Sequence, residues 1–246
     1  MNKDKLAVLI DADNTSANIA DALFAEIAKF GIASVKRIYG NWDSPYISAW
    51  KPSVLSHAIV PVQQFAYTAG KNATDMAMVI DAMDLLYSGN VDAFCLVSSD
   101  SDFTRLAMRI RENGLTVYGF GKQNTPESLR KACDKFVYTE ILQNNQEKEN
   151  NQIVQNNVIN RQSGQQLKGN TKLIKLLRDA VREHCDESGW ATLGPVGSYM
   201  NNVNSDFDAR NYGYSKLSEL IKAIDLFELK IENKSAFVRD CRNVEH

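Results

Sequence analysis

Short apolar runs and helically spaced apolar residues alternate along the first half of the chain. The apolar runs predict buried strands at 6–10, 34–39, 59–65, 93–97, 115–120 and 136–138. The helical spacing predicts helices at 15–30, 45–57, 74–87, 103–112 and 126–132. Strands that alternate with helices in this way predict an α/β fold, a three-layer sandwich around a largely parallel sheet.

Two prolines and one threonine refine these elements. Pro52 is expected to interrupt the helix at 45–57. Pro61 restricts the strand at 59–65 to an edge of the sheet or to the start of the strand. Thr74 is a candidate N-cap for the apolar helix that follows it.

The pattern breaks after residue 142. More than half of residues 143–170 are Asn or Gln, and few are apolar. Such a segment cannot bury enough surface to offset the entropy lost on ordering. We therefore expect an N-terminal domain at 1–142, a flexible linker at 143–169 and a second domain at 170–246.

The second domain has the outline of a winged helix. Helical spacing begins at Leu173, continues at 193–200 and returns at 217–224. Two short strand-like runs, 227–231 and 235–238, flank Asn233-Lys234 and predict a hairpin. Three helices followed by a β-hairpin make up that small fold.

Composition excludes several classes of protein. No apolar run approaches the roughly 18 residues that cross a bilayer, and the polar N-terminus is not a secretory signal, so we expect a cytoplasmic protein without membrane contact. The 4 cysteines are far apart and form no C-x-x-C pair, which argues against a zinc site. A net charge of −2 argues against a protein that coats nucleic acid by bulk charge.

The candidate chemistry lies in acids that follow strands. Asp11 and Asp13 follow the strand at 6–10, and Asp100 and Asp102 follow the strand at 93–97. Ligand sites in open α/β sheets form at the carboxyl ends of strands, so neighbouring strands would bring these acids together. Asp75, at the start of the helix at 74–87, is a fifth candidate.

A cluster of carboxylates requires a compensating positive charge. Oxygen ligands without His or Cys select hard ions such as Mg²⁺ or Mn²⁺. Such an ion can generate hydroxide near neutral pH and stabilise in-line displacement at phosphorus. The acids therefore predict a metal-dependent nuclease, in which Asp11, Asp13, Asp100 and Asp102 share one crevice around the ion and Asp75 is a candidate fifth ligand.

Simpler roles are open for several acids. Asp13 and Asn14 are candidate caps for the helix near Thr15, and Asp102 for the helix at 103–112. Asp75 is favoured in a first turn by the helix dipole alone. Asp81 is about 240° around the helix from Asp75, so we expect a buried structural role for it, and a solvated position for Asp84.

Polar neighbours of the same crevice are candidates for binding substrate. They are Asn14, Ser98, Ser99, Lys71, Arg105 and Trp42. Lys71 and Arg105 could hold phosphate, with solvation or a surface ion pair as the alternative. Trp42 could stack on a base, as could Tyr39, for which core packing is the alternative.

Five ordered motifs in residues 5–142 resemble the NYN domain, the LabA-like branch of the PIN-like nucleases. They are Leu9-Ile-Asp-Ala-Asp-Asn14, Tyr39-Gly-Asn-Trp42, Lys71-Asn-Ala-Thr-Asp75 with Asp81, Val97-Ser-Ser-Asp-Ser-Asp-Phe103, and Gly121 followed by Thr125 to Cys133. The resemblance implies a PIN-like Rossmannoid fold and a metal-dependent ribonuclease site at Asp11, Asp75, Asp100 and Asp102. Relatives often carry an acid where Asn41 stands here, which argues against a metal role for that loop.

The C-terminal part resembles a LOTUS (OST-HTH) domain. The similarity lies in Gly189-Trp190, in 214–217 and in 220–229. It implies a small winged-helix module that binds RNA or a protein partner, although acids slightly outnumber bases in this part. The sequence leaves open whether the protein is an oligomer.

These observations favour an endoribonuclease with Mg²⁺ or Mn²⁺ as cofactor and RNA as substrate. An alternative is a catalytically inactive scaffold that binds RNA or protein. Another is a phosphatase of the haloacid-dehalogenase type, in which Asp11 is the nucleophile and Asp13 the acid/base. Asn14 departs from the motif of that class.

Overall fold

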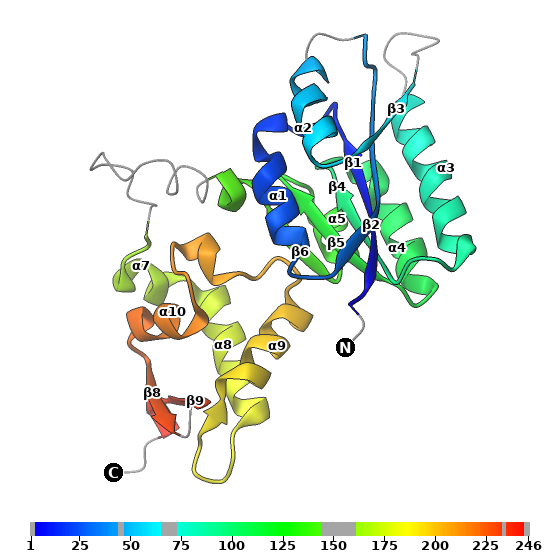
Figure 1. Ribbon diagram of the computed structural model, residues 1–246. Helices are drawn as coiled ribbons and strands as arrows, with labels where there is room; N and C mark the ends of the chain where they lie inside the picture. The colour runs from blue at the N-terminus through cyan, green and yellow to red at the C-terminus, as the bar shows by residue number, and fades with distance from the viewer. Residues whose placement is uncertain (1–2, 44–46, 65–72, 144–160, 233–234, 244–246) are drawn as a thin grey trace. The chain divides into compact units, whose positions relative to one another are not determined.

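The computed structural model describes residues 3–43, 47–64, 73–143, 161–232 and 235–243. The chain divides into two compact units, Met1–Gln152 and Ile153–His246. Each unit is described by itself, and Figure 1 labels the elements of both. In the described part of the chain, no helix has the length and apolar character required to cross a membrane.

The N-terminal unit is built on a six-stranded sheet in the order β3-β2-β1-β4-β5-β6, and every pairing is parallel. The strands are β1 (Lys5–Asp11), β2 (Ile32–Gly40), β3 (Val60–Gln63), β4 (Ala93–Val97), β5 (Thr116–Gly121) and β6 (Lys135–Tyr138). Their order confirms the predicted fold. Pro61 lies in edge strand β3, where its missing N–H leaves no ladder bond unmade.

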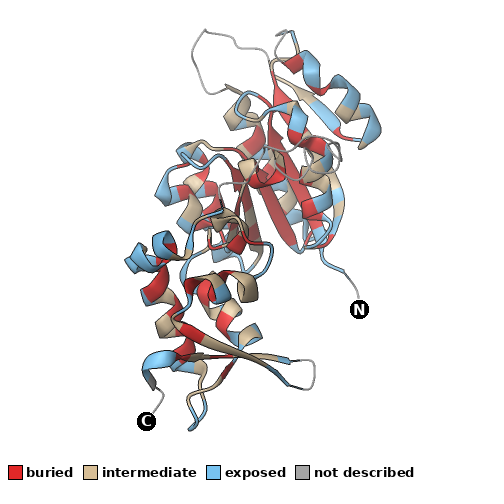
Figure 2. Ribbon diagram, turned by 90° about the vertical axis from the view of Figure 1, so that its left-hand side faces the viewer, coloured by how far each residue is buried: buried red, intermediate tan, exposed pale blue. Residues whose placement is uncertain are grey.

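Helices cover both faces of this sheet. Alternate residues of β1 point to opposite faces: Leu6, Val8 and Ile10 pack on one side, and Ala7 and Leu9 on the other. The first side is covered by α1 (Ala20–Ile27) and by the segment that contains α2 (Lys51–Ser56). The second is covered by α3 (Ala73–Ser88), α4 (Thr104–Glu112) and α5 (Glu127–Ala132). Figure 1 shows the strands between these helices, and Figure 2 shows the buried residues along the strands of the sheet.

Several predicted details of the helices differ from the structure. Pro52 does not interrupt a helix: it lies in the first turn of α2, where its missing N–H costs nothing. A short 3₁₀ helix, Ile47–Trp50, precedes it. Thr74 is not an N-cap, because α3 already includes Ala73. The helix predicted at 15–30 is a 3₁₀ turn at Ala17–Ile19 followed by α1.

The C-terminal unit contains the predicted three helices and hairpin. The helices are α8 (Thr171–His184), α9 (Leu193–Val203) and α10 (Leu217–Ile224). Strands β8 (Phe227–Glu232) and β9 (Ser235–Asp240) form the hairpin, and β7 (Ala191–Thr192) adds to β9. Its core includes the amphipathic faces of the three helices, Phe227 of β8 and Val238 of β9.

The predicted linker extends less far than its composition suggested. Residues 161–169 belong to the C-terminal unit, where they form α7 (Gly164–Gly169) and the turn before it. Ser163 caps α7 through a capping box with Gln166, and Leu167 is fully buried. The hydroxyl of Tyr214 donates to the carbonyl of Gln162 at 2.7 Å. Gln143 ends the described part of the N-terminal unit, and residues 144–160 of the predicted linker lie outside the described residues.

Candidate metal centre

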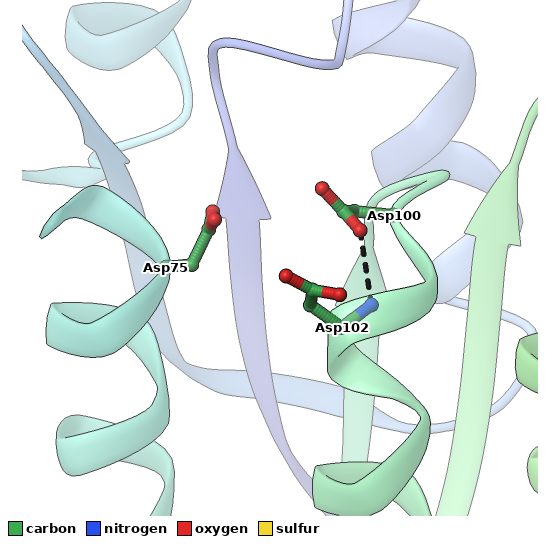
Figure 3. Close-up of side chains that lie close together, drawn as sticks. All are labelled: Asp75, Asp100 and Asp102. Carbon is green, nitrogen blue, oxygen red and sulfur yellow. Dashed lines mark hydrogen bonds between the residues drawn. The ribbon is translucent and has the colours of Figure 1, made fainter. Parts of the chain in front are cut away.

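Three carboxylates converge at the carboxyl end of the sheet. Oxygen atoms of Asp75, Asp100 and Asp102 lie within 4.8 Å of one another. Asp75 reaches from the first turn of α3, and the other two come from the loop and 3₁₀ turn that follow β4 (Figure 3). We call these three residues the acidic trio. The sequence placed all three at one crevice, and the structure brings them together.

Asp11 lies buried at the end of β1, next to the acidic trio. Alternation along β1 places it on the same face as Ala7 and Leu9, which is the face of α3 and α4. Its side chain is almost completely buried, at 1% exposure. Of the neighbouring charges that raise the pKa of Asp75, the charge of Asp11 has the largest effect. The two carboxylates are therefore close enough to repel each other.

All the hydrogen-bonding capacity of Asp11 is used within the protein. Oδ1 accepts from the backbone N–H groups of Asp13 and Asn14, at 3.1 and 3.2 Å. Oδ2 accepts from the Asn14 amide and from the Ser98 hydroxyl, both at 2.7 Å. An ionised carboxylate offers about four lone-pair positions, and all are taken. Direct coordination of an ion by Asp11 therefore requires that at least one of these four donors release its oxygen.

Ser98 and Asp100 hold the loop after β4 in place. The Ser98 oxygen accepts from the backbone N–H of Asp100 at 3.1 Å while its hydroxyl donates to Asp11. Asp100 Oδ1 accepts from the backbone N–H of Asp102 at 2.9 Å, so Asp100 is the N-cap of the 3₁₀ turn at Ser101–Phe103. The capping role considered for Asp102 falls to Asp100 instead. The other carboxylate oxygen of Asp100, Oδ2, takes no part in the cap.

Repulsion within the cluster changes its protonation. Burial, and then the charges of Asp11, Asp100, Asp102 and Asp13, raise the pKa of Asp75 to about 6. Burial also raises the pKa of Asp11, against the opposing effect of its hydrogen bonds. Oxygen donors that repel one another when charged fit a hard divalent cation, which removes the cost of their charge.

Residues 5–142 match the family described as the NYN domain. The chain belongs to the NYN domain family. NYN domains are part of the PIN-like nuclease superfamily, whose members usually use divalent metal ions. A second match, to the OST-HTH/LOTUS domain, covers residues 168–238, and LOTUS domains are associated with RNA binding.

Solved structures of two uncharacterised proteins are similar to parts of the chain. One, a protein of unknown function from Vibrio parahaemolyticus, is 19% identical, covers 56% of this chain and 93% of its own, and has a TM-score of 0.49. The other, from Nitrosomonas europaea, is 39% identical, covers 29% of this chain and 73% of its own, and has a TM-score of 0.26. No curated protein matches the chain.

The remaining acids of the NYN domain divide into peripheral and structural residues. Asp13 is exposed and acts on Asp11 and Asp75 through its charge, but it is not part of the acidic trio. Asp81 accepts from the hydroxyl of Tyr39 and pairs with Arg37, each at 2.8 Å. This confirms a structural role for Asp81, although its side chain is half-buried rather than buried. Asp84 is exposed, as predicted.

The predicted substrate-binding residues lie in different surroundings. Asn14 and Ser98 support Asp11, and the Ser99 oxygen accepts from the backbone N–H of Lys122 at 2.9 Å. Arg105 is exposed on α4. Trp42 packs partly against the core on the α1 side, so only part of its indole is open to a base. Lys71 lies outside the described residues.

Two residues of the NYN motifs, Tyr39 and Asn41, have structural roles. Tyr39 is fully buried, and its contact with Asp81 favours core packing over base stacking. Asn41 accepts from the side chain of Gln63 at 3.1 Å and from the backbone N–H of Asp43 at 3.3 Å. The amide at position 41 thus holds the turn after β2 against the end of β3.

Proposed function

We propose that this protein is a metal-dependent endoribonuclease whose acidic trio holds Mg²⁺ or Mn²⁺. One observation carries the proposal: oxygens of Asp75, Asp100 and Asp102 lie within 4.8 Å of one another in a unit that belongs to the NYN domain family. The LOTUS match in the same chain favours RNA as the substrate. A module that binds RNA on the same chain raises the local concentration of substrate.

The three side chains of the trio would hold the ion with oxygen atoms alone. When bound there, a divalent ion supplies a water of lowered pKa and a positive charge for the phosphate oxygens. Asp11 adds negative charge next to the trio from the end of β1, where its four hydrogen bonds hold its carboxylate in place. Asp100 needs only Oδ1 for its capping bond, which leaves Oδ2 for the ion.

The arrangement of Asp11 does not support the phosphatase alternative. A nucleophilic carboxylate must present an oxygen to phosphorus in line with the leaving group. Asp11 is 1% exposed, and both of its oxygens accept two hydrogen bonds. A phosphoaspartate at Asp11 would have to break contacts on both sides of the carboxylate.

A cleavage assay tests the proposal. The purified full chain is incubated with labelled single-stranded RNA or DNA, with Mn²⁺ or with EDTA. We expect internal cleavage of RNA that requires the metal and that falls by roughly a hundredfold or more in Asp100→Asn, because removing electrostatic stabilisation at a reacting centre costs about 10²–10³ in rate. Asp84→Asn, an exposed position on α3, is the matched control and should cleave as the parent does.

Two outcomes would contradict the proposal. If the parent cleaves neither polymer with Mn²⁺ while binding RNA tightly, the protein is a scaffold. If Asp100→Asn cleaves at the rate of the parent, the activity belongs to another site or to a contaminant.

A further inference from the structure

A polar cleft opens beside the acidic trio, at the carboxyl ends of four strands. Its volume is about 190 Å³, and it is lined by segments that follow β1, β4, β5 and β6. The lining includes Ser16 after β1, Ser99 after β4, Lys122 after β5 and Glu140 after β6. None of them belongs to the acidic trio.

The position of the cleft follows from the strand order. The chain leaves β1 toward α1 on one face of the sheet and leaves β4 toward α4 on the other. This reversal between neighbouring strands is where open α/β sheets form their ligand crevices. The trio lies on the side of α3 and α4, whereas Ile19 in the cleft wall belongs to the core on the α1 side.

Two residues connect the cleft to the acidic site. Asn14 lines the cleft and donates to Asp11 at 2.7 Å. Ser99 lines the cleft and immediately precedes Asp100 of the trio. A strand of nucleic acid with one phosphate at the trio would therefore place a neighbouring nucleotide at the cleft.

The lining suits a sugar–phosphate backbone better than a base. It offers the hydroxyls of Ser16 and Ser99 and the ammonium of Lys122, which are groups that contact phosphate oxygens. No aromatic ring is among the described residues that line it. Base stacking on an aromatic ring contributes about 1–3 kcal/mol per base, and this cleft does not provide it.

Glu140 favours a sugar over a free phosphate ion. Its Oε1 accepts from the backbone N–H of Gln123 at 3.0 Å. Its Oε2 has no hydrogen-bond partner within the described part of the chain and is buried, so a ligand donor reaches it only when the Glu140 side chain turns into the cleft. A buried carboxylate oxygen without a donor costs free energy, and a hydrogen bond from a sugar hydroxyl would remove that cost. A phosphate ion has no such donor when fully ionised and would be repelled by the carboxylate.

We propose that this cleft binds the ribose–phosphate unit next to the scissile phosphodiester of RNA. Lys122 and Ser99 face the phosphate, and Glu140 accepts from the ribose 2′-hydroxyl. The inference rests on the proposed function, since it assumes that an RNA strand crosses the acidic trio. It adds that the cleft reads the sugar and not the base.

Site-resolved NMR titration of the full chain tests this assignment. Asp100→Asn keeps the RNA intact, and the probes are eight-residue U and A ribonucleotides and an eight-residue deoxyuridine oligonucleotide, with Mg²⁺ present. We expect the backbone signals of Ser16, Ser99 and Lys122 to shift on addition of either ribonucleotide. The deoxyribose probe should need a higher concentration to produce the same shift.

Lys122→Ala should weaken binding at these signals by roughly three- to tenfold, equally for the U and A probes, because a phosphate contact is independent of sequence. Lys5→Ala, an exposed lysine at the opposite end of β1, is the control. Glu140→Gln should reduce the difference in binding affinity between the ribose and deoxyribose probes.

The inference is overturned if the cleft signals do not respond, if Lys122→Ala binds as Lys5→Ala does, or if both sugars bind there equally. Failure of the proposed function gives a different result. In that case the parent chain cleaves no RNA with Mn²⁺, while the cleft signals still respond to the ribonucleotides.

Discussion

The Ser98 hydroxyl donates a hydrogen bond of 2.7 Å to Oδ2 of Asp11, which joins the ends of the neighbouring strands β4 and β1. Both side chains are buried, at 2% and 1% exposure. The same serine oxygen accepts from the backbone N–H of Asp100. One buried hydroxyl therefore supports an acid of β1 and positions an acid of the trio.

Removing this hydroxyl should destabilise the N-terminal unit and disturb the trio. Ser98→Ala leaves Asp11 with one donor fewer in a buried place, at a cost of about 1–3 kcal/mol in the free energy of unfolding. Urea unfolding measures that cost, and Mn²⁺ titration measures the effect on the trio. Ser101→Ala, an exposed serine three residues away, is the control and should change neither quantity. Equal stability of the two variants would show that the contact contributes nothing.

Metal binding should depend on pH through Asp75. Burial and neighbouring negative charges raise its pKa to about 6, above the ordinary carboxyl value of 3.8, so the folded, metal-free chain holds an extra proton between these values. By linkage, the contribution of Asp75 to the free energy of unfolding is lost as pH rises through that window. A cation must displace the proton, so we expect the Mn²⁺ affinity to rise roughly tenfold between about pH 5 and pH 7.

Calorimetry at about pH 5.5 in buffers of different ionisation enthalpy measures the proton released. Asp75→Asn should bind Mn²⁺ more weakly and without this release. It should also raise the melting temperature of the metal-free chain, by roughly 1–3 °C, because one repelling charge is gone. An affinity that is flat between these pH values would contradict the raised pKa.

The contact between Tyr39 and Asp81 should stabilise the seating of α3 on β2. Asp81→Ala leaves the buried Tyr39 hydroxyl and the Arg37 guanidinium without their acceptor, at a cost of about 1–3 kcal/mol. Asp84→Ala, exposed one turn later on the same helix, should stay within about 0.5 kcal/mol of the parent. Denaturant unfolding followed at the N-terminal unit distinguishes the two, and equal values would remove the structural role assigned to Asp81.

Leu167 tests whether residues 161–169 belong to the C-terminal unit. It is fully buried in the core of that unit, so Leu167→Ala should cost about 2–5 kcal/mol. Gln165→Ala, exposed in the same helix, serves as the control. If Leu167→Ala melts as Gln165→Ala does, the segment is a linker as its composition suggests.

Much of the NYN fold could be predicted because its central strands, β1 and β4, are buried on both faces. A strand such as β4, with five buried residues between turns, gives an unambiguous apolar run. Strand order gives no such signal. The position of Asp11 beside the trio could be anticipated only from the rule that ligands gather at the carboxyl ends of strands.

Other features depend on contacts between residues far apart in the sequence. Nothing local to Asp11 indicates that its four lone-pair positions are filled, since one donor is Ser98, 87 positions away. Lys122 and Glu140 were missed because their cleft is assembled from four separate loops. The helix α7 was missed because its Asn- and Gln-rich surroundings conceal one buried leucine and a capping box.

The most direct test of the central claim is the anomalous scattering of crystals soaked in Mn²⁺. If the acidic trio is a metal centre, a peak should lie about 2.0–2.2 Å from carboxylate oxygens of Asp75, Asp100 and Asp102, and it should be lost in Asp100→Asn. A crystal that binds Mn²⁺ elsewhere, or that shows no peak among these three side chains, would contradict the account.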